Sequence, residues 1–233
     1  MDLPASTLAT VKAPRRTPMP SRSAAMCKPK EPAANRERII GAAIKEFAAR
    51  GFKGASMDAI AARTHTTRAL INYYFGGKEK VYLAVLEHVY AEIRKAESLL
   101  DLDHLGPVDA IRSIVQFTFD YYLNHEGFVR LVVAENQAKG RHFRKSKAMR
   151  SLNRPIIDTL ARVIVRGQVE GLFRADVDPV EVHKTMAALG MFNVTNQYTF
   201  GAIFQRDMGA RGDVGRRREM VTEVILSYLG NTH

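Results

Sequence analysis

The sequence predicts an all-α fold, and three observations lead to that prediction. From Asn35 onward, apolar side chains recur at intervals of three and four residues, the spacing that places them on one face of a helix. No stretch shows the sustained one-in-two alternation of a half-buried strand. Short breaks containing glycine, proline or capping residues separate the apolar stretches. We therefore expect a series of helices joined by short connections.

The first four expected helices follow closely on one another. In the first, the apolar positions fall on one face, Asn35 can cap the N-terminus, and Gly51 is a stop signal. Ser56 can cap the second. These helices are expected at about residues 36–50, 57–63, 68–74 and 78–100.

Five further helices are expected in the rest of the chain. Gly106-Pro107 suits the start of a helix because proline is tolerated in a first turn, and Asp178-Pro179 gives a similar signal. Pro155 is expected to bend its helix or to mark its start. The helices are expected from residue 107, at 126–138, at 145–170, at 179–204 and at 216–229, with a loop at 207–215.

The chain has 233 residues, and its net charge of +11 is concentrated near the N-terminus. Residues 1–34 hold six Lys or Arg against two Asp or Glu, and residues 35–80 hold nine against four. The remainder holds twenty against eighteen. A basic first third on a nearly neutral remainder is typical of a protein that binds a polyanion. A generally basic soluble protein is the alternative, but it would carry the excess along its whole length.

Composition excludes several classes of protein. Cys27 is the only cysteine, so the chain can form neither an internal disulfide nor a paired-cysteine zinc site. The seven histidines show no metal-ligand spacing, and no Ser/His/Asp set or glycine-rich phosphate loop can be assembled. No apolar run approaches the ~18–20 residues needed to cross a bilayer. We expect a cytoplasmic protein with no metal site and no cofactor.

Residues 1–34 contain six prolines and show no apolar periodicity, so we expect a disordered basic tail. Its composition is similar to that of an organelle transit peptide, but nothing else points to an organelle. Two interpretations stay open. The tail can be a basic arm that adds phosphate contacts, or residues 1–25 can precede a true start at Met26.

Residues 56–83 are the most informative segment of the chain. They read as two short helices joined by a tight turn, followed by the start of a third. The second short helix carries small, polar and aromatic side chains where a purely structural helix would carry Leu or Glu. A helix-turn-helix has this composition when its second helix enters the DNA major groove. The segment is therefore expected to bind DNA.

The same segment resembles the N-terminal domain of TetR-family transcriptional regulators. The resemblance covers about residues 36–87, and the later residues match mainly in their helical layout. Two positions depart from the family pattern: His65 stands where the family usually has glycine, and Thr66 where it usually has valine. The matching positions are Ile60-Ala61, Thr67, Tyr74-Phe75 and Lys78-Glu79.

The resemblance implies the architecture and the function. It implies a three-helix helix-turn-helix DNA-binding domain over residues 35–80, joined by a fourth helix to a helical effector-binding and dimerisation domain over residues 81–233. The function implied is sequence-specific regulation of transcription, by a repressor that a small-molecule effector releases from a pseudo-palindromic operator. Its partners would be double-stranded DNA, a second copy of the chain and an unknown effector, and no membrane.

DNA contacts are expected from the recognition helix and from nearby helix starts. Thr67 can cap the recognition helix and reach a phosphate, and Asn72 can form a bidentate pair with adenine. Arg68 can reach a guanine edge or a phosphate. Phe75 is better explained as a core residue. The expected contacts are Ser56, Thr66, Thr67, Arg68, Ala69, Asn72, Tyr73 and Lys78.

Two further sets of residues come from the C-terminal helices. Aromatic, methionine and amide side chains on inner faces suit either a packed core or an effector pocket, and the candidates are Phe117, Tyr121, Met186, Phe192, Asn193 and Asn196. Strong apolar stripes suit either core or a four-helix dimer interface. The interface candidates are Ile156, Ile157, Leu160, Val163, Ile164, Met220, Val221, Val224, Ile225 and Tyr228.

Two other functions stay open at this point. The chain can be a DNA-binding regulator without a small-molecule effector, for instance one controlled by a protein partner. It can also be an enzyme on an all-α scaffold, although no catalytic constellation in the sequence supports that reading.

Overall fold

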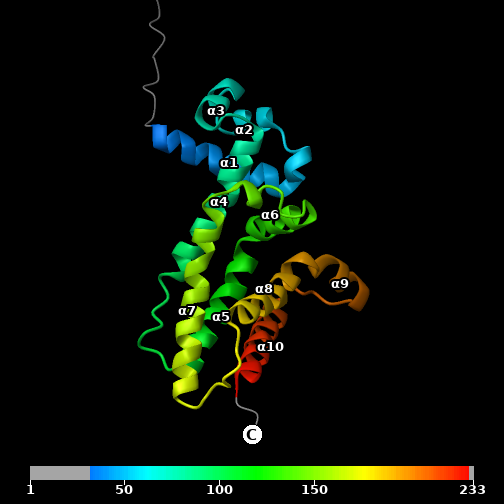
Figure 1. The fold of residues 1–233 in the computed structure, drawn as a ribbon. Coiled ribbons are helices and arrows are strands. Elements are labelled where there is room, and N and C mark those ends of the chain that lie inside the picture. The colour runs from blue at the N-terminus through cyan, green and yellow to red at the C-terminus, as the bar shows by residue number, and fades with distance from the viewer. Residues whose placement is uncertain (1–31, 231–233) are drawn as a thin grey trace, which may run out of the picture.

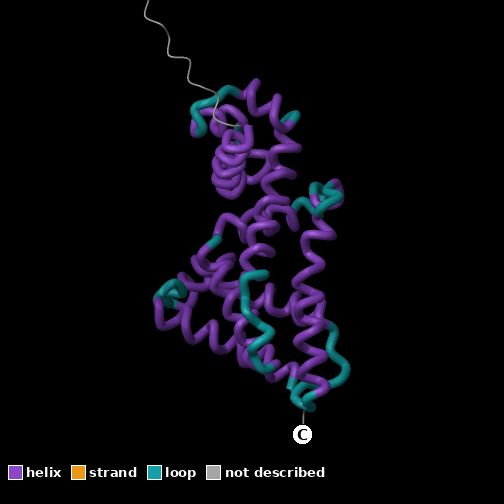
Figure 2. Tube along the Cα trace, turned by 90° about the vertical axis from the view of Figure 1, so that its left-hand side faces the viewer, coloured by secondary structure: helices purple, strands orange, loops and turns teal. Residues whose placement is uncertain are grey.

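The computed structural model describes residues 32–230, and within this range it contains helices and no sheet, which confirms the predicted fold class (Figure 1). Seen at right angles, this part of the chain is helical almost throughout (Figure 2). The elements are α1 (Pro32–Gly54), α2 (Met57–Arg63), α3 (Arg68–Phe75), α4 (Lys78–Glu97), α5 (Pro107–Asn124), α6 (Glu126–Gln137), the 3-10 helix η1 (Phe143–Lys145), α7 (Met149–Val169), α8 (Pro179–Thr195), α9 (Gln197–Phe204) and α10 (Arg211–Leu229).

Helices α1, α2 and α3, here called the head, pack against one another and against the start of α4 at one end of the molecule (Figure 1). Their shared core is apolar and fully buried, as the 0% exposure of Phe47, Ile60 and Ile71 shows. Because these three side chains come one from each helix, burying them fixes the three helices relative to one another.

Helices α5 to α10, here called the body, form the second part of the molecule. Helix α5 packs against α7, α8 and α10, and a core that includes Ile111, Phe119, Leu160 and Ile225 fills the space between them. Helix α4 runs from the head into the body, and α6 packs on α1. Helices α4 and α6 therefore both link the head to the body.

The observed helix boundaries differ from the predicted ones near the N-terminus and in α7. Helix α1 begins at Pro32, so residues 32–34 are helical and do not belong to a tail. The rest of the predicted tail, with Met26 and Cys27, lies outside the described residues. Helix α1 is interrupted at Gly51, where φ is 63°. Pro155 lies inside α7 and does not mark its start.

The single helix predicted for residues 179–204 is two helices. Asn196, with φ −118° and ψ 3°, separates α8 from α9, and α9 projects away from the other body helices (Figure 1). The predicted loop at 207–215 is shorter, because α10 begins at Arg211 and not near residue 216. Among the described residues, no helix is long and apolar enough to span a bilayer.

Candidate nucleic-acid interface and body cavities

Side-chain caps begin both α2 and α3, and the second cap lies in the turn between the two helices. Ser56 Oγ accepts the Ala59 N–H at 3.4 Å, and Thr67 Oγ1 accepts the Leu70 N–H at 3.1 Å. His65 adopts a φ of 49° within the turn. This is the left-handed region, which histidine enters more readily than most residues, so the family glycine is replaced without loss of the turn.

Helix α3 has one face in the core and one face in solvent. Ile71 and Phe75 point inward, with exposures of 0% and 7%, and hold the helix on the head. The opposite face is exposed, and Tyr73 on it is 83% exposed. Five of the residues predicted to contact DNA are exposed on or beside this face: Thr67, Arg68, Ala69, Asn72 and Tyr73.

The structure limits two of the predicted DNA contacts. Thr66 is partly buried and its hydroxyl oxygen is enclosed by the protein, so this hydroxyl does not lie on the exposed face of α3. The ammonium of Lys78 donates to the Lys53 carbonyl at 3.2 Å and lies 5.2 Å from the centre of the Phe52 ring. Lys78 therefore ties α4 to the end of α1 when no DNA is bound.

Sequence reasoning missed Glu46, which joins α1 to α2. Its carboxylate is 1% exposed, and Oε1 accepts the Ser56 N–H at 3.1 Å. Arg50 and Arg63 lie 3.4 and 3.5 Å from the carboxylate oxygens. A signal existed, because Glu46 stands three residues after Ala43 and seven after Ile39, on the apolar stripe of α1.

A second carboxylate missed from the sequence lies where the body meets the head. Glu135, at the end of α6, is 1% exposed and accepts three hydrogen bonds: from the His142 N–H at 2.6 Å, the His142 Nδ1 at 2.8 Å and the Phe143 N–H at 3.1 Å. The His142 ring lies between Phe52 of α1 and Tyr82 of α4, at centroid distances of 4.6 and 4.8 Å.

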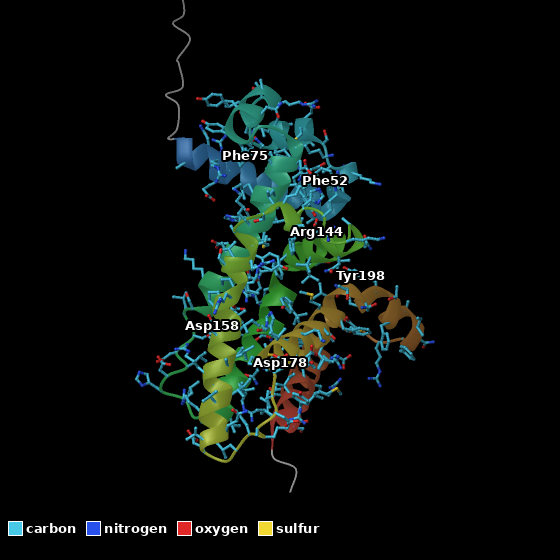
Figure 3. All side chains as sticks on the ribbon, in the orientation of Figure 1. Phe52, Phe75, Arg144, Asp158, Asp178 and Tyr198 are labelled. Atoms are coloured by element: carbon cyan, nitrogen blue, oxygen red, sulfur yellow. The ribbon has the colours of Figure 1, made fainter. Side chains whose placement is uncertain are left out.

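The segment after α6 therefore connects the two parts of the protein. Figure 3 labels Phe52 at the end of α1 and, on the neighbouring segment, Arg144 of η1. Lys145 of the same segment bonds Glu79 at the start of α4, at 2.5 Å. No sequence pattern marks this arrangement, because its partners come from three separate elements.

The six residues predicted to contact an effector do not line one cavity. Phe117 and Tyr121 line a cavity of about 580 Å³ bordered by α1, α4, α5 and α6. Phe192 and Asn193 line a different cavity of about 450 Å³ between α8, α9 and α10. Met186 is buried in the body core, and Asn196 separates α8 from α9. The six candidates therefore do not share a single cavity, and their contacts with an effector stay a prediction.

A cluster of buried polar side chains lies between α4, α5 and α8. Arg94 Nη2 and Glu97 Oε1 are 3.0 Å apart, and both side chains are less than a tenth exposed. Burial raises the pKa of Glu97 to about 7, although Arg94 opposes this. Burial, with a contribution from Arg94, lowers the pKa of His183 to about 4.

Most of the predicted dimer contacts are core residues of the single chain. Six of them are at most 4% exposed and have no surface to offer a partner, which corrects the prediction for Ile156, Leu160, Val163, Ile164, Val221 and Ile225. Ile157 is partly buried. The remaining three, Met220, Val224 and Tyr228, are exposed on α10 by 52%, 46% and 41%. Within residues 32–230, no group of three or more His, Cys, Asp or Glu side chains can hold a metal ion.

Comparison with known families assigns both parts of the chain. Residues 39–85 match the family model of the bacterial regulatory proteins of the tetR family, and residues 107–225 match that of the tetracyclin repressor-like C-terminal domain. The HTH-type transcriptional repressor NicS of Pseudomonas putida is 37% identical over 173 residues, which are 74% of this chain and 82% of that protein.

Solved structures share the fold. A regulatory protein of the tetR family from Rhodococcus has a TM-score of 0.66 at 18% identity, over 85% of this chain and 98% of that one. The transcriptional regulator FadR of Bacillus subtilis, solved in complex with stearoyl-CoA, has a TM-score of 0.65 at 14% identity, over 83% of this chain and 98% of that one. With the helix-turn-helix geometry and the two family matches, these likenesses show that the chain belongs to the TetR family of DNA-binding transcriptional regulators and not to a family of enzymes.

Proposed function

We propose that this protein is a cytoplasmic repressor that binds a pseudo-palindromic operator as a homodimer and leaves it when a small-molecule effector binds. The observation that carries the proposal is the exposed face of α3, which the buried Ile71 and Phe75 hold against the core of the head. Residues 35–80 would then act as the DNA-binding domain, and residues 81–233 as the effector-binding and dimerisation domain.

Each exposed residue of this face has a proposed part in DNA recognition. Asn72 would read adenine through its side-chain amide, and Arg68 would reach a guanine edge or a phosphate. Tyr73 and Thr67 would hold the backbone, with the N–H groups at the start of α3 assisting. Ser56, at the start of α2, would bind a phosphate, and Lys78 would do so after leaving the Lys53 carbonyl.

For the dimer we propose α8 and α10 in place of α7 and α10. Met220, Val224 and Tyr228 recur every four residues on α10, so they form an exposed apolar stripe. Helix α8 packs beside α10 and exposes Val180 and Ala188. Two copies related by a two-fold axis would bury both helices in a four-helix interface. The two recognition helices would then lie about one duplex turn, roughly 34–36 Å, apart.

The effector is proposed to bind in the body and to act through α4 and α6. An effector that prefers a different spacing of the heads shifts the dimer away from DNA only as far as its affinity differs between the two states. The contacts of Glu135, His142 and Phe52 give such a shift a physical route into the head. The stearoyl-CoA bound to FadR supports the idea of a ligand in a body of this fold.

Operator binding is tested with the purified protein and the DNA upstream of its own gene, by fluorescence anisotropy over a salt series. Asn72→Ala is expected to lose about tenfold in affinity for the specific site while its affinity for random DNA is unchanged. Lys78→Ala is expected to weaken binding to both and to reduce the salt slope by about one. Lys95→Ala, an exposed lysine near the far end of α4, is the matched control.

The dimer is tested by light scattering on two variants that each place a charge on an exposed valine. Val224→Glu on α10 is expected to produce monomers, whereas Val165→Glu on α7, where the valine is 55% exposed, is expected to leave the dimer intact. The opposite result would return the interface to α7. Failure of the protein to bind any DNA at low salt would overturn the proposed function itself.

A further inference from the structure

The core of the body contains four polar side chains whose hydrogen-bonding capacity is not met by the described part of the chain. Arg94 is 9% exposed, and its Nε and Nη1 have no acceptor. Glu97 Oε1 lies 3.0 Å from Arg94 Nη2 but outside hydrogen-bonding alignment. Thr118 Oγ1, in a side chain 1% exposed, and His183 Nδ1 also have no partner.

These groups come from three helices, of which α5 packs against both of the others. Arg94 and Glu97 lie on α4, Thr118 on α5 and His183 on α8. After burial, the charge of Arg94 is the second cause that lowers the pKa of His183. Thr118 stands one turn before Tyr122, whose ring lies 3.1 Å from the position of a Cβ on Gly190 of α8, so this face of α5 is turned toward α8.

A small cavity lies beside the pair formed by Arg94 and Glu97. Its volume is about 60 Å³, room for a few water-sized groups, and its walls include Leu102, Ile114 and Ile156. Polar groups therefore line one side of an otherwise apolar space. This combination of apolar walls and a few placed polar groups is what small-ligand sites have.

Burying polar atoms without partners costs free energy, and native proteins pair more than nine-tenths of them. Several unmet groups in one place indicate that a molecule from outside completes the set. The charge of that molecule follows from the pair on α4. Nε and Nη1 of the buried Arg94 have no acceptor, and Glu97 is not aligned to accept from Nη2. An anion, which brings acceptors and negative charge, is therefore the occupant that fits, and burial, which raises the pKa of Glu97 to about 7, agrees with this.

The two larger cavities offer weaker polar recognition. In the one next to α1, Asp120 is already bonded to Arg218, at 3.0 Å. In the one between α8 and α10, Asp213 is already bonded to Arg216. Neither holds a guanidinium buried as deeply as that of Arg94.

We propose that the cluster of Arg94, Glu97, Thr118 and His183 recognises the effector and that the effector is a small organic carboxylate. Arg94 donates to the carboxylate, and the Thr118 hydroxyl and the His183 ring complete its hydrogen bonds. Glu97 orients the guanidinium. Because Arg94 and Glu97 end the helix that begins at the head, a ligand that draws them toward α5 and α8 also moves α4. This inference rests on the proposed effector-controlled repressor and names its ligand class.

The test compares carboxylates with amides of the same shape on the full-length protein. Acetate, butyrate and benzoate are titrated against acetamide, butyramide and benzamide, with the melting temperature and the heat of binding as readouts. At least one carboxylate is expected to raise the melting temperature and its amide to have no effect, since a ligand that binds only the folded state stabilises it. If no carboxylate in the series acts, or if the amides act equally, the ligand class is wrong.

Two variants distinguish recognition from a structural role. Thr118→Val removes a buried hydroxyl that lacks a partner, so without ligand this protein is expected to melt at the same temperature as the wild type or higher. Arg94→Met takes the ion-pair partner from the buried Glu97, so without ligand this protein is expected to melt at a lower temperature. Both are expected to bind the active carboxylate at least tenfold more weakly. Arg154→Met, at an arginine 80% exposed on α7, is the control and should change neither readout. Lower melting temperatures with unchanged carboxylate binding would show that the cluster is structural.

Operator binding measured on the same samples separates this inference from the proposed function. Release of operator DNA by the active carboxylate, lost in Arg94→Met, supports both. A protein that binds its operator but ignores every carboxylate overturns the inference and leaves the repressor. A protein that binds the carboxylate through Arg94 but binds no DNA keeps the ligand site and overturns the repressor.

Discussion

The head and the body differ in how far their buried polar groups find partners. In the head, the Glu46 carboxylate accepts the Ser56 N–H and faces two arginines, and the Thr64 hydroxyl donates to the Ile60 carbonyl at 3.0 Å. Two atoms are exceptions there: Thr66 Oγ1 has no partner, and Glu46 Oε2 has no hydrogen bond, although Arg63 lies 3.5 Å from it. In the body, Arg94, Thr118 and His183 keep atoms without partners. A part that presents one rigid surface to DNA is stabilised when its buried polar groups are hydrogen-bonded within the protein. A part that responds to a ligand can keep some polar groups without partners, because the ligand then supplies the missing hydrogen bonds.

The largest effect is expected at Glu135, which accepts three hydrogen bonds at the junction of the head and the body. Glu135→Ala leaves three buried donors without their acceptor, and we expect a loss of about 3 kcal/mol in the free energy of unfolding. Urea denaturation measures it. Glu126→Ala, which removes a half-exposed carboxylate from the same helix, should cost less than about 0.5 kcal/mol. If both variants lose the same free energy of unfolding, Glu135 does not stabilise the junction.

Glu46→Ala is expected to have the next largest effect, of about 2 kcal/mol, because the Ser56 N–H loses its acceptor and α2 loses its tie to α1. Its arginine partners are 63% and 47% exposed and can return to water, so the effect should be smaller than at Glu135. Glu37→Ala, at a carboxylate 63% exposed on the same helix, is the control. In Glu46→Ala, both the free energy of unfolding, measured by urea denaturation, and the affinity for the operator should fall. In Glu37→Ala, neither quantity should change.

Thr67→Ala tests whether the recognition helix depends on its cap. The lost hydrogen bond to the Leu70 N–H should cost about 1 kcal/mol, the usual effect of removing an N-cap side chain. Thr195→Ala is a suitable comparison, since that exposed hydroxyl bonds the carbonyl of Met191 within a helix and caps nothing. Thermal unfolding of the two variants gives the difference, and equal melting temperatures would contradict a role of the cap in stability.

The same contrast explains what the sequence predicted and what it did not. The head depends on local signals, such as the cap at Thr67 and the tight turn at His65, so its helices and its exposed face were predicted closely. Contacts such as those of His142 with Phe52 and Tyr82 join residues far apart in the chain, and no local pattern encodes them.

The body also shows how an apolar stripe misleads. The stripe that contains Leu160 and Ile164 has the same spacing whether it faces a partner or the chain's own core, and it faces the core. The break between α8 and α9 at Asn196 was also missed, because apolar side chains occur on both sides of it and no proline or glycine stands beside it in the sequence.

The smallest expected effect concerns the pH dependence of the body. The pKa of Glu97 is about 7 in the folded protein, above its ordinary value of 4.5, so the folded state holds this proton more tightly and stability falls as pH rises from about 4.5 to 7. The pKa of His183 is about 4, below its ordinary value of 6.5, so the unfolded state takes up this proton first and stability falls as pH is lowered from about 6.5 to 4. Between pH 5 and 6.5 the two residues therefore act with opposite sign.

Glu97→Gln and His183→Gln should separate these opposing slopes. Relative to the wild type, the melting temperature of Glu97→Gln should rise from pH 5 to pH 6.5, because only the His183 contribution is left, and that of His183→Gln should fall over the same range. Each difference should amount to at most about 1 kcal/mol, or about 2–4 °C in a chain of this size. Other titrating groups, including the nearby Tyr122, are present in all three proteins and cancel in the comparison. If the melting temperatures of the three proteins change in parallel between pH 5 and pH 6.5, then Glu97 and His183 have the same pKa in the folded and the unfolded state. The difference between the head and the body would then not extend to the protonation of these buried groups.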